Sequence, residues 1–160
     1  MTAKKAGIST RNSTPHPPKT RDFAMNNDIE ALLARKDLSG VDFDSQNVSG
    51  FSFAGKDLSG ACFDDAIAVK TNFQGCDLYW SRFFRANVQG ADFRKARLNG
   101  ATLDLADFTN ADLRGADFGP DNLNGLTSVV ETNFKGAKYD RHTVLPDGLI
   151  PKSQGMIYSE

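Results

Sequence analysis

The side chains that most often carry out catalysis are few in this sequence and stand far apart. His16 and His142 lie near the two ends of the 160-residue chain, so no histidine accompanies a serine or cysteine in the long middle section. Cys62 and Cys76 lack the paired spacing of zinc ligands, and two cysteines do not make a disulfide framework. We therefore expect both cysteines to be structural, and we predict no catalytic residue, no metal site and no cofactor.

Aspartates are the most numerous candidate groups, and many recur at a fixed spacing. Asp37, Asp57, Asp77 and Asp117 fall in one column at a spacing of twenty, with Arg97 at the remaining place. Such a column can be an acidic stripe for a metal or a basic partner. Alternatively, each carboxylate accepts hydrogen bonds from the backbone of its own turn. The same residue type recurs in other columns, which favours the structural interpretation, and Arg97 would relieve the repulsion between its acidic neighbours.

A second candidate is a cluster of aromatic and basic residues in the middle of the chain. Trp, Tyr and Arg are the types enriched at the hot spots of protein interfaces. The predicted partner-binding patch consists of Tyr79, Trp80, Arg82, Phe84, Arg85, Arg94 and Arg97. The alternative is that Tyr79 and Trp80 shield a corner of the fold and that Phe84 packs on a neighbouring side chain.

A five-residue repeat positions all of these groups. From Leu38 to Leu123 an apolar residue, here called the centre, returns every five positions. The residue two before it is small, Asp or Asn precedes it, and Gly often follows it by two. On an α-helix, a spacing of five residues would distribute the centres over every face. On a strand, the same spacing would place successive centres on opposite faces. The chain must therefore turn once per repeat, with Gly supplying the permissive backbone.

Residues 36–40, Lys-Asp-Leu-Ser-Gly, recur unchanged as residues 56–60, twenty positions later. At this spacing the centres sort by type into four columns, one of leucines, two of phenylalanines and one of smaller residues. The three columns of large residues are Leu38, Leu58, Leu78 and Leu98; Phe43, Phe63 and Phe83; and Phe53, Phe73 and Phe93. Four repeats per coil follow, so the coil is square and its phenylalanines stack at the spacing of neighbouring strands, about 4.8 Å.

The tandem Ala-Asp/Asn-Leu/Phe-x-x repeats resemble the pentapeptide-repeat family over residues 36–140. The resemblance implies an all-β solenoid, a right-handed quadrilateral β-helix of about four to five coils. Four larger residues occupy slots that should be small, and all lie in or next to the first coil, where they put regular coil geometry in question. These residues are Lys36, Gln46, Phe51 and Lys56.

The chain divides into four predicted parts. Its start lacks an apolar pattern and contains three prolines, which is typical of a flexible segment. Asn27 as N-cap and Glu30 three residues later favour a short capping helix. The unbroken register predicts that no loop projects from the coils. The parts are a flexible tail at 1–27, a capping helix at 28–35, the β-helix at 36–125, and a last irregular coil with a C-terminal cap at 126–160.

Charge and hydropathy restrict the possible partners. The net charge of −1 argues against direct nucleic-acid binding, and no apolar stretch is long enough to cross a membrane. Two cysteines in this length favour a reducing compartment, so we expect a cytoplasmic protein, while the resemblance also leaves the thylakoid lumen open.

The leading hypothesis for function is a non-catalytic interaction or scaffold module, a rigid rod with an unknown protein partner. We expect a monomer or an end-to-end dimer. The resemblance offers an alternative, because some family members imitate duplex DNA and bind DNA gyrase. Residues 36–140 hold fifteen acidic and eleven basic residues, a weak excess for such a mimic. A catalytic β-helix would need a cleft built by long loops, and none is expected here.

Overall fold

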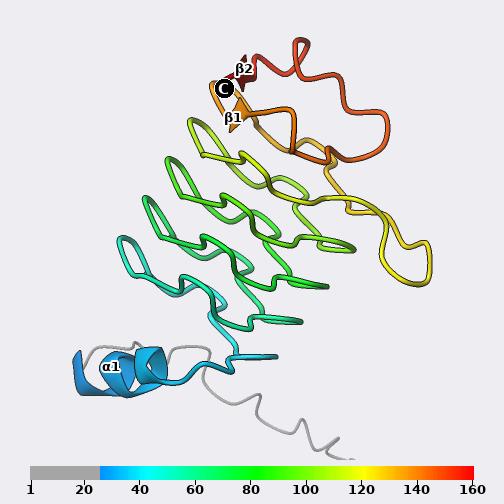
Figure 1. Cartoon of the computed structure of the whole chain (residues 1–160). Helices are drawn as coiled ribbons and strands as arrows, with labels where there is room; N and C mark the ends of the chain where they lie inside the picture. The colour runs from blue at the N-terminus through cyan, green and yellow to red at the C-terminus, as the bar shows by residue number, and fades with distance from the viewer. Residues whose placement is uncertain (1–25) are drawn as a thin grey trace, which may run out of the picture.

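The computed structural model describes residues 26–160, so the flexible tail predicted for 1–27 lies almost wholly outside the described residues. Three regular elements occur in the described part: α1 (Asn26–Ala34), β1 (Lys138–Tyr139) and β2 (Ile157–Tyr158). Between α1 and β1 the chain winds into a stack of similar coils (Figure 1). No helix in this part of the chain has the length and apolar character needed to cross a bilayer.

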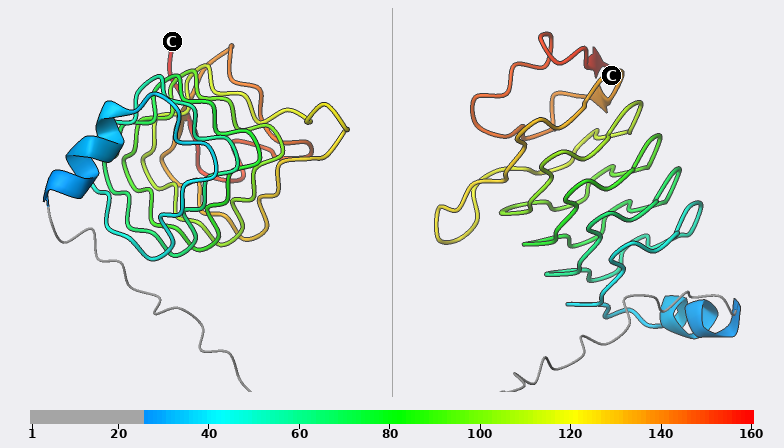
Figure 2. Two further views of the ribbon diagram at one scale, coloured as in Figure 1. Left: turned by 90° about the horizontal axis from the view of Figure 1, so that it is seen from below. Right: turned by 180° about the vertical axis from the view of Figure 1, so that it is seen from behind.

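Parallel bridges between successive coils define four faces of the stack. Each bridge in the regular part joins a residue to the one twenty positions later, as between Asp37 and Asp57. The bridge residues of face 1 are Asp37, Asp57, Asp77, Arg97 and Asp117, and those of face 2 are Asp42, Cys62, Arg82 and Thr102. Those of face 3 are Asn47, Ile67, Asn87 and Asp107, and those of face 4 are Ser52, Asn72, Asp92 and Asp112. The stack is therefore four-sided (Figure 2).

A two-residue turn follows each centre and forms the corner between two faces. The second turn residue has a positive φ at every repeat from Gly40 to Gly115. Glycine adopts this conformation without steric cost, whereas residues such as Trp80 (φ 55°) and Arg85 (φ 56°) hold it against their own preference. The five-residue period therefore results from one left-handed residue per repeat.

The centres of the regular coils fill the interior. Every centre from Leu38 to Phe118 is at most 1% exposed, which confirms the inward assignment over that range. Phe63 lies between Phe43 and Phe83 in one column, with ring centroids 4.8 and 4.7 Å apart and nearly parallel planes. Its edge faces the second phenylalanine column at Phe73, 5.4 Å away. Two aromatic stacks thus pack edge to face along the core.

The first coil is regular despite its larger side chains. Its bridges to the second coil have the same twenty-residue spacing as the bridges between later coils. The large residues at small positions therefore do not disturb the coil geometry. Phe51 is half-buried and packs against the core. The Nζ atom of Lys56 donates to the carbonyls of Leu33 and Arg35, at 2.6 Å each, and so satisfies the C-terminal end of α1. Lys56 thereby ties α1 to the side of the first coil (Figure 2).

The register breaks after Phe118, five residues before the predicted end. Leu123, predicted as a centre, is 72% exposed, and the bridges from Thr102 to Ser128 and from Asp107 to Asn133 now span 26 residues. Residues 119–127 form a loop that projects from the stack (Figure 1). The predictions of a register unbroken to Leu123 and of coils without a projecting loop are therefore wrong. The reason is Pro120, which occupies the turn position that requires a positive φ and cannot adopt it.

The C-terminal segment closes the far end. β1 pairs with β2 in parallel, Lys138 with Ile157 and Tyr139 with Tyr158. The chain between them crosses the end of the stack (Figures 1 and 2), where Pro146 and Met156 are buried. This segment covers core groups that an open solenoid end would expose.

Candidate functional site

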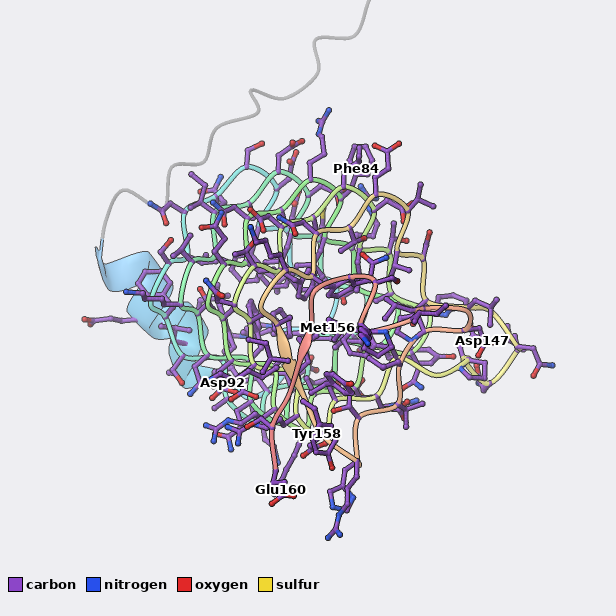
Figure 3. All side chains as sticks on the ribbon, turned by 90° about the horizontal axis from the view of Figure 1, so that it is seen from above. Phe84, Asp92, Asp147, Met156, Tyr158 and Glu160 are labelled. Atoms are coloured by element: carbon purple, nitrogen blue, oxygen red, sulfur yellow. The ribbon has the colours of Figure 1, made fainter. Side chains whose placement is uncertain are left out.

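The predicted patch is divided among three corners of the stack. Tyr79 and Trp80 lie at the corner between faces 1 and 2, which we call the loop corner because it also bears loop 119–127. Phe84 and Arg85 form the turn between faces 2 and 3. Arg94 lies in the turn between faces 4 and 1; its partner Asp92 and Phe84 are on opposite sides of the stack (Figure 3). Arg82 and Arg97 stand on faces 2 and 1. The seven residues therefore do not make one continuous surface.

The corner between faces 2 and 3 is the acidic corner. Its turns carry Asp44, Asp64, Asp65, Asp104 and Glu131. Arg85 forms a bidentate pair with Asp65, at 2.8 and 2.7 Å, and its guanidinium lies 4.8 Å from the Phe84 ring. Arg82 on face 2 pairs with Asp64. Both arginines predicted as partner contacts are thus already engaged with carboxylates of the coil below.

The corner between faces 4 and 1 is the basic corner, with Arg94, Lys95, Arg114, Arg141 and His142. Arg94 and Arg114 each form a salt bridge with the aspartate two residues earlier, Asp92 and Asp112. The shortest distance from guanidinium nitrogen to carboxylate oxygen is 2.6 Å in both pairs. These fork-shaped pairs fix both guanidinium groups. Side chains of this corner line a shallow hollow of about 340 Å³ that also includes Asp140. The hollow is therefore only weakly positive.

The loop corner combines two stacked aromatic rings with an arginine. The Tyr79 and Trp80 rings are parallel, with an interplanar angle of 5° and centroids 5.7 Å apart. The Arg97 guanidinium lies 4.6 Å from the centre of the Tyr79 ring and donates to Asp77 at 3.0 Å. Arg97, Tyr79 and Trp80 therefore form one contacting group within the predicted patch, as Phe84 and Arg85 do at the acidic corner.

Both aromatic residues hold loop 119–127. Trp80 Nε1 donates to Asp121 Oδ2 at 2.6 Å, and the Tyr79 hydroxyl donates to Asn122. The other Asp121 oxygen accepts from the backbone N–H groups of Leu123 and Gly125, at 2.7 and 2.6 Å. The bond from Trp80 holds the pKa of Asp121 below its ordinary value of 3.8. One carboxylate thus organises the loop.

The base of the loop rests on two residues of the coil below. A Cβ on Gly100 would overlap the Trp80 indole, so only glycine lets the ring lie flat across this turn. Asn99 Nδ2 donates to the carbonyls of Gly119 and Pro120, at 3.2 and 3.4 Å. The alternative expectation, that Tyr79 and Trp80 shield a corner, therefore describes only part of their role, because they also support the loop.

The outer surface of the loop corner carries three exposed apolar side chains beside the exposed amides of Asn122 and Asn124. Leu123 is 72% exposed, Leu126 56% and Trp80 50%. Sequence reasoning missed Leu123 and Leu126 because it assigned the first to the core. Pro120 was the signal that could have placed both on the surface.

Neither cysteine has the features of a reactive thiol, as expected. Cys76 is buried and its thiol donates to the Phe53 carbonyl at 2.9 Å. Burial raises the pKa of Cys62 and of Cys76 to about 11, so both stay protonated near neutral pH. Among residues 26–160 no three His, Cys, Asp or Glu side chains gather where they could hold a metal ion.

The face aspartates serve the turns, as the structural interpretation predicted. Asp57 Oδ1 accepts from the backbone N–H and the hydroxyl of Ser59, at 2.9 and 2.7 Å. Asp107 makes the same pair of bonds to Thr109. These bonds stabilise the corner two residues later in the chain.

The family model for pentapeptide repeats matches eight copies over residues 37–75, 68–100 and 81–119. The chain belongs to the pentapeptide repeat family, whose fold is the right-handed quadrilateral β-helix. No curated protein matches the chain.

Solved structures of the same family resemble parts of the chain. A pentapeptide repeat protein from the Arabidopsis thaliana thylakoid lumen is 35% identical over 64% of this chain and 70% of its own, with a TM-score of 0.39. Rfr23 from the cyanobacterium Cyanothece 51142 is 37% identical over 64% of this chain and 63% of its own, with a TM-score of 0.40. QnrB1, a plasmid-mediated fluoroquinolone resistance protein, is 16% identical over 78% and 86%, with a TM-score of 0.24.

Proposed function

We propose that the protein is a non-catalytic interaction module and that it binds a protein partner through the loop corner. The observation that carries the proposal is the exposed apolar surface of Leu123, Leu126 and Trp80 on a loop held in one conformation. Exposed apolar side chains gathered at one place mark interaction sites in soluble proteins. The partner would therefore present an apolar surface to this corner.

The rest of the molecule acts as the rigid support. A rod of four to five coils, with α1 at its first coil, holds the loop at one end of the stack. The hydrogen bonds that Asp121 accepts fix the loop before a partner binds. The loop would therefore lose little conformational entropy on association. A module of this kind contributes position and shape. It needs no reacting group, in keeping with the structural role general in this family.

The experiment is a pull-down with the full chain as bait and mass spectrometry of what it retains. The test variant is Leu123→Ser/Leu126→Ser, and the matched control is Ile67→Ser/Ile150→Ser, two apolar residues exposed elsewhere at 46% and 64%. Both pairs lie on the surface, so neither should change folding much. We expect a protein that wild type and the control retain and the loop variant loses. Equal retention by all three would contradict the proposal.

A second candidate is the gyrase-binding function of a DNA mimic. The acidic corner is the observation that favours it, because its carboxylates follow one long side of the rod, as phosphates follow a strand. Against it, Arg82 and Arg85 neutralise Asp64 and Asp65 in the middle of that line. An assay of DNA supercoiling by gyrase tests it, and inhibition or quinolone protection that Asp44→Asn/Asp104→Asn abolishes would favour this function over the first.

We further propose that the module acts as a monomer or an end-to-end dimer and that it works in the cytoplasm, with the thylakoid lumen as the alternative. Light scattering of the purified chain distinguishes the two oligomeric states. Fractionation of the source cells distinguishes the two compartments.

A further inference from the structure

The loop corner contains both Asn-Gly pairs of the chain, Asn99-Gly100 and Asn124-Gly125. Asparagine is among the chemically least stable residues, because its side-chain amide can be lost by deamidation. Glycine in the next position favours this reaction, since a backbone nitrogen without a neighbouring side chain can approach the amide carbon closely. The two pairs have different surroundings, so their reactivities should differ.

Asn124 is exposed, and its side-chain amide makes no hydrogen bond within residues 26–160. The amide is therefore free to turn toward the next backbone nitrogen. Asn99 is only 8% exposed, and its amide nitrogen donates to the carbonyls of Gly119 and Pro120. Reaction at Asn99 would first have to break these two bonds. We therefore expect Asn124 to be the reactive member of the two.

The backbone nitrogen beside Asn124 also holds the loop. The Gly125 N–H donates to Asp121 Oδ1 at 2.6 Å, and the Asp121 N–H donates to the Gly125 carbonyl at 2.8 Å. A ring closed between Asn124 and Gly125 leaves that nitrogen without a hydrogen, so its bond to Asp121 is lost. Cyclisation and anchoring of the loop thus compete for the same N–H group.

We propose that Asn124 is a deamidation site and that the reaction releases loop 119–127 from Asp121. The Gly125 nitrogen loses its proton to a base in the solvent and bonds to the side-chain carbonyl carbon of Asn124. The bond from that carbon to the amide nitrogen breaks, and the nitrogen takes a proton from solvent and leaves as ammonia. One water molecule then opens the resulting succinimide ring to aspartate or isoaspartate.

Both products disturb the turn that Asp121 organises. Each carries a negative charge close to the Asp121 carboxylate, and isoaspartate also lengthens the backbone by one carbon. A released loop would no longer hold Leu123 and Leu126 in place, so the surface for a partner would have a limited lifetime. This last consequence rests on the proposed function, whereas the reaction does not.

The test is a timed incubation of the purified full chain in mildly alkaline buffer, followed by tryptic digestion and mass spectrometry. Trypsin places Asn99 and Asn124 in separate peptides, residues 98–114 and 115–135, and fragment spectra identify the changed residue. We expect Asn124 to exchange its amide for a carboxyl group at least about tenfold faster than Asn99. Equal rates, or a faster reaction at Asn99, would overturn the proposal.

Trp80 fluorescence of the same samples tests the release of the loop. We expect it to shift in proportion to the conversion of Asn124. Asn124→Gly is the matched control, because glycine adopts the φ of 62° without steric cost and has no amide to lose. Its fluorescence should stay constant during the incubation. Constant fluorescence in converted wild type would contradict the release.

A second variant tests the competition for the Gly125 N–H. Asp121→Ala frees this group, so Asn124 should react faster in the variant than in wild type. A slower reaction would contradict the protective role of the bond. No partner takes part in these measurements, so their failure is distinguishable from a failure of the pull-down.

Discussion

The regular coils and loop 119–127 stabilise their polar groups in different ways. In the coils each face residue forms a parallel bridge to the residue one coil away, so the same backbone bridges repeat along four faces. In the loop a single side chain, Asp121, accepts the bonds of Leu123, Gly125 and Trp80. The coils are thus stabilised by a repeated pattern, whereas the loop is held by a few individual side chains, above all Asp121. A surface of this second kind can change or disappear while the rod persists.

The largest expected difference is between the inside and the outside of one turn. Phe83→Ala removes a fully buried ring from the middle of an aromatic column and should cost about 3–5 kcal/mol of unfolding free energy. Phe84→Ala, the next residue along, removes a half-exposed ring at the acidic corner and should cost under about 1 kcal/mol. Thermal unfolding of both variants measures the contrast. Equal melting temperatures would refute the inward assignment.

The next effect compares two glycines in the same turn position. A Cβ added to Gly60 (φ 65°) would meet no atom within 4 Å, so Gly60→Ala should cost about 1 kcal/mol, for the left-handed backbone alone. Gly100→Ala adds an overlap with the Trp80 ring and should cost at least about 2 kcal/mol. Because Trp80 is the single tryptophan, its fluorescence should shift only in the second variant. A shift in neither would contradict the contact.

The smallest effect is a loosening of the loop in acid. The pKa of Asp121 is lowered in the folded chain, so its stabilisation of the loop is complete above the unfolded value near 3.8 and is lost as the pH falls through the lower folded value. Trp80 fluorescence should therefore change below about pH 4 before the coils unfold. Asp121→Asn should show the altered fluorescence at neutral pH, with no such acid step. An unchanged acid titration in that variant would contradict the assignment.

The sequence was sufficient for the core because one residue type recurs at one place in every coil. Leu38, Phe43 and their successors follow a period that neither a helix nor a flat strand can hold, and the period alone implies the inward columns. The residue at which the five-residue register ends could not be predicted from apolar spacing and required attention to backbone conformation. Pro120 breaks the φ requirement of the turn, although Leu123 keeps the apolar spacing.

The candidate site was predictable in part. Each step of five residues moves a side chain by one corner, so Tyr79, Phe84 and Arg94 had to lie on three different corners. The spacing thus argued against one continuous patch. The bonds from Tyr79 and Trp80 to Asn122 and Asp121 could not be derived in the same way, because residues of the loop do not follow the period.

The most direct test of the account is to remove the loop and measure stability and partner binding together. Deleting residues 120–125 with Leu126→Gly joins Gly119 to a regular turn residue and restores the five-residue spacing to Val129. We expect a melting temperature within a few degrees of wild type and loss of the partner retained in the pull-down. A variant that unfolds would show that the coils depend on the loop. A folded variant that still retains the partner would show that binding lies elsewhere.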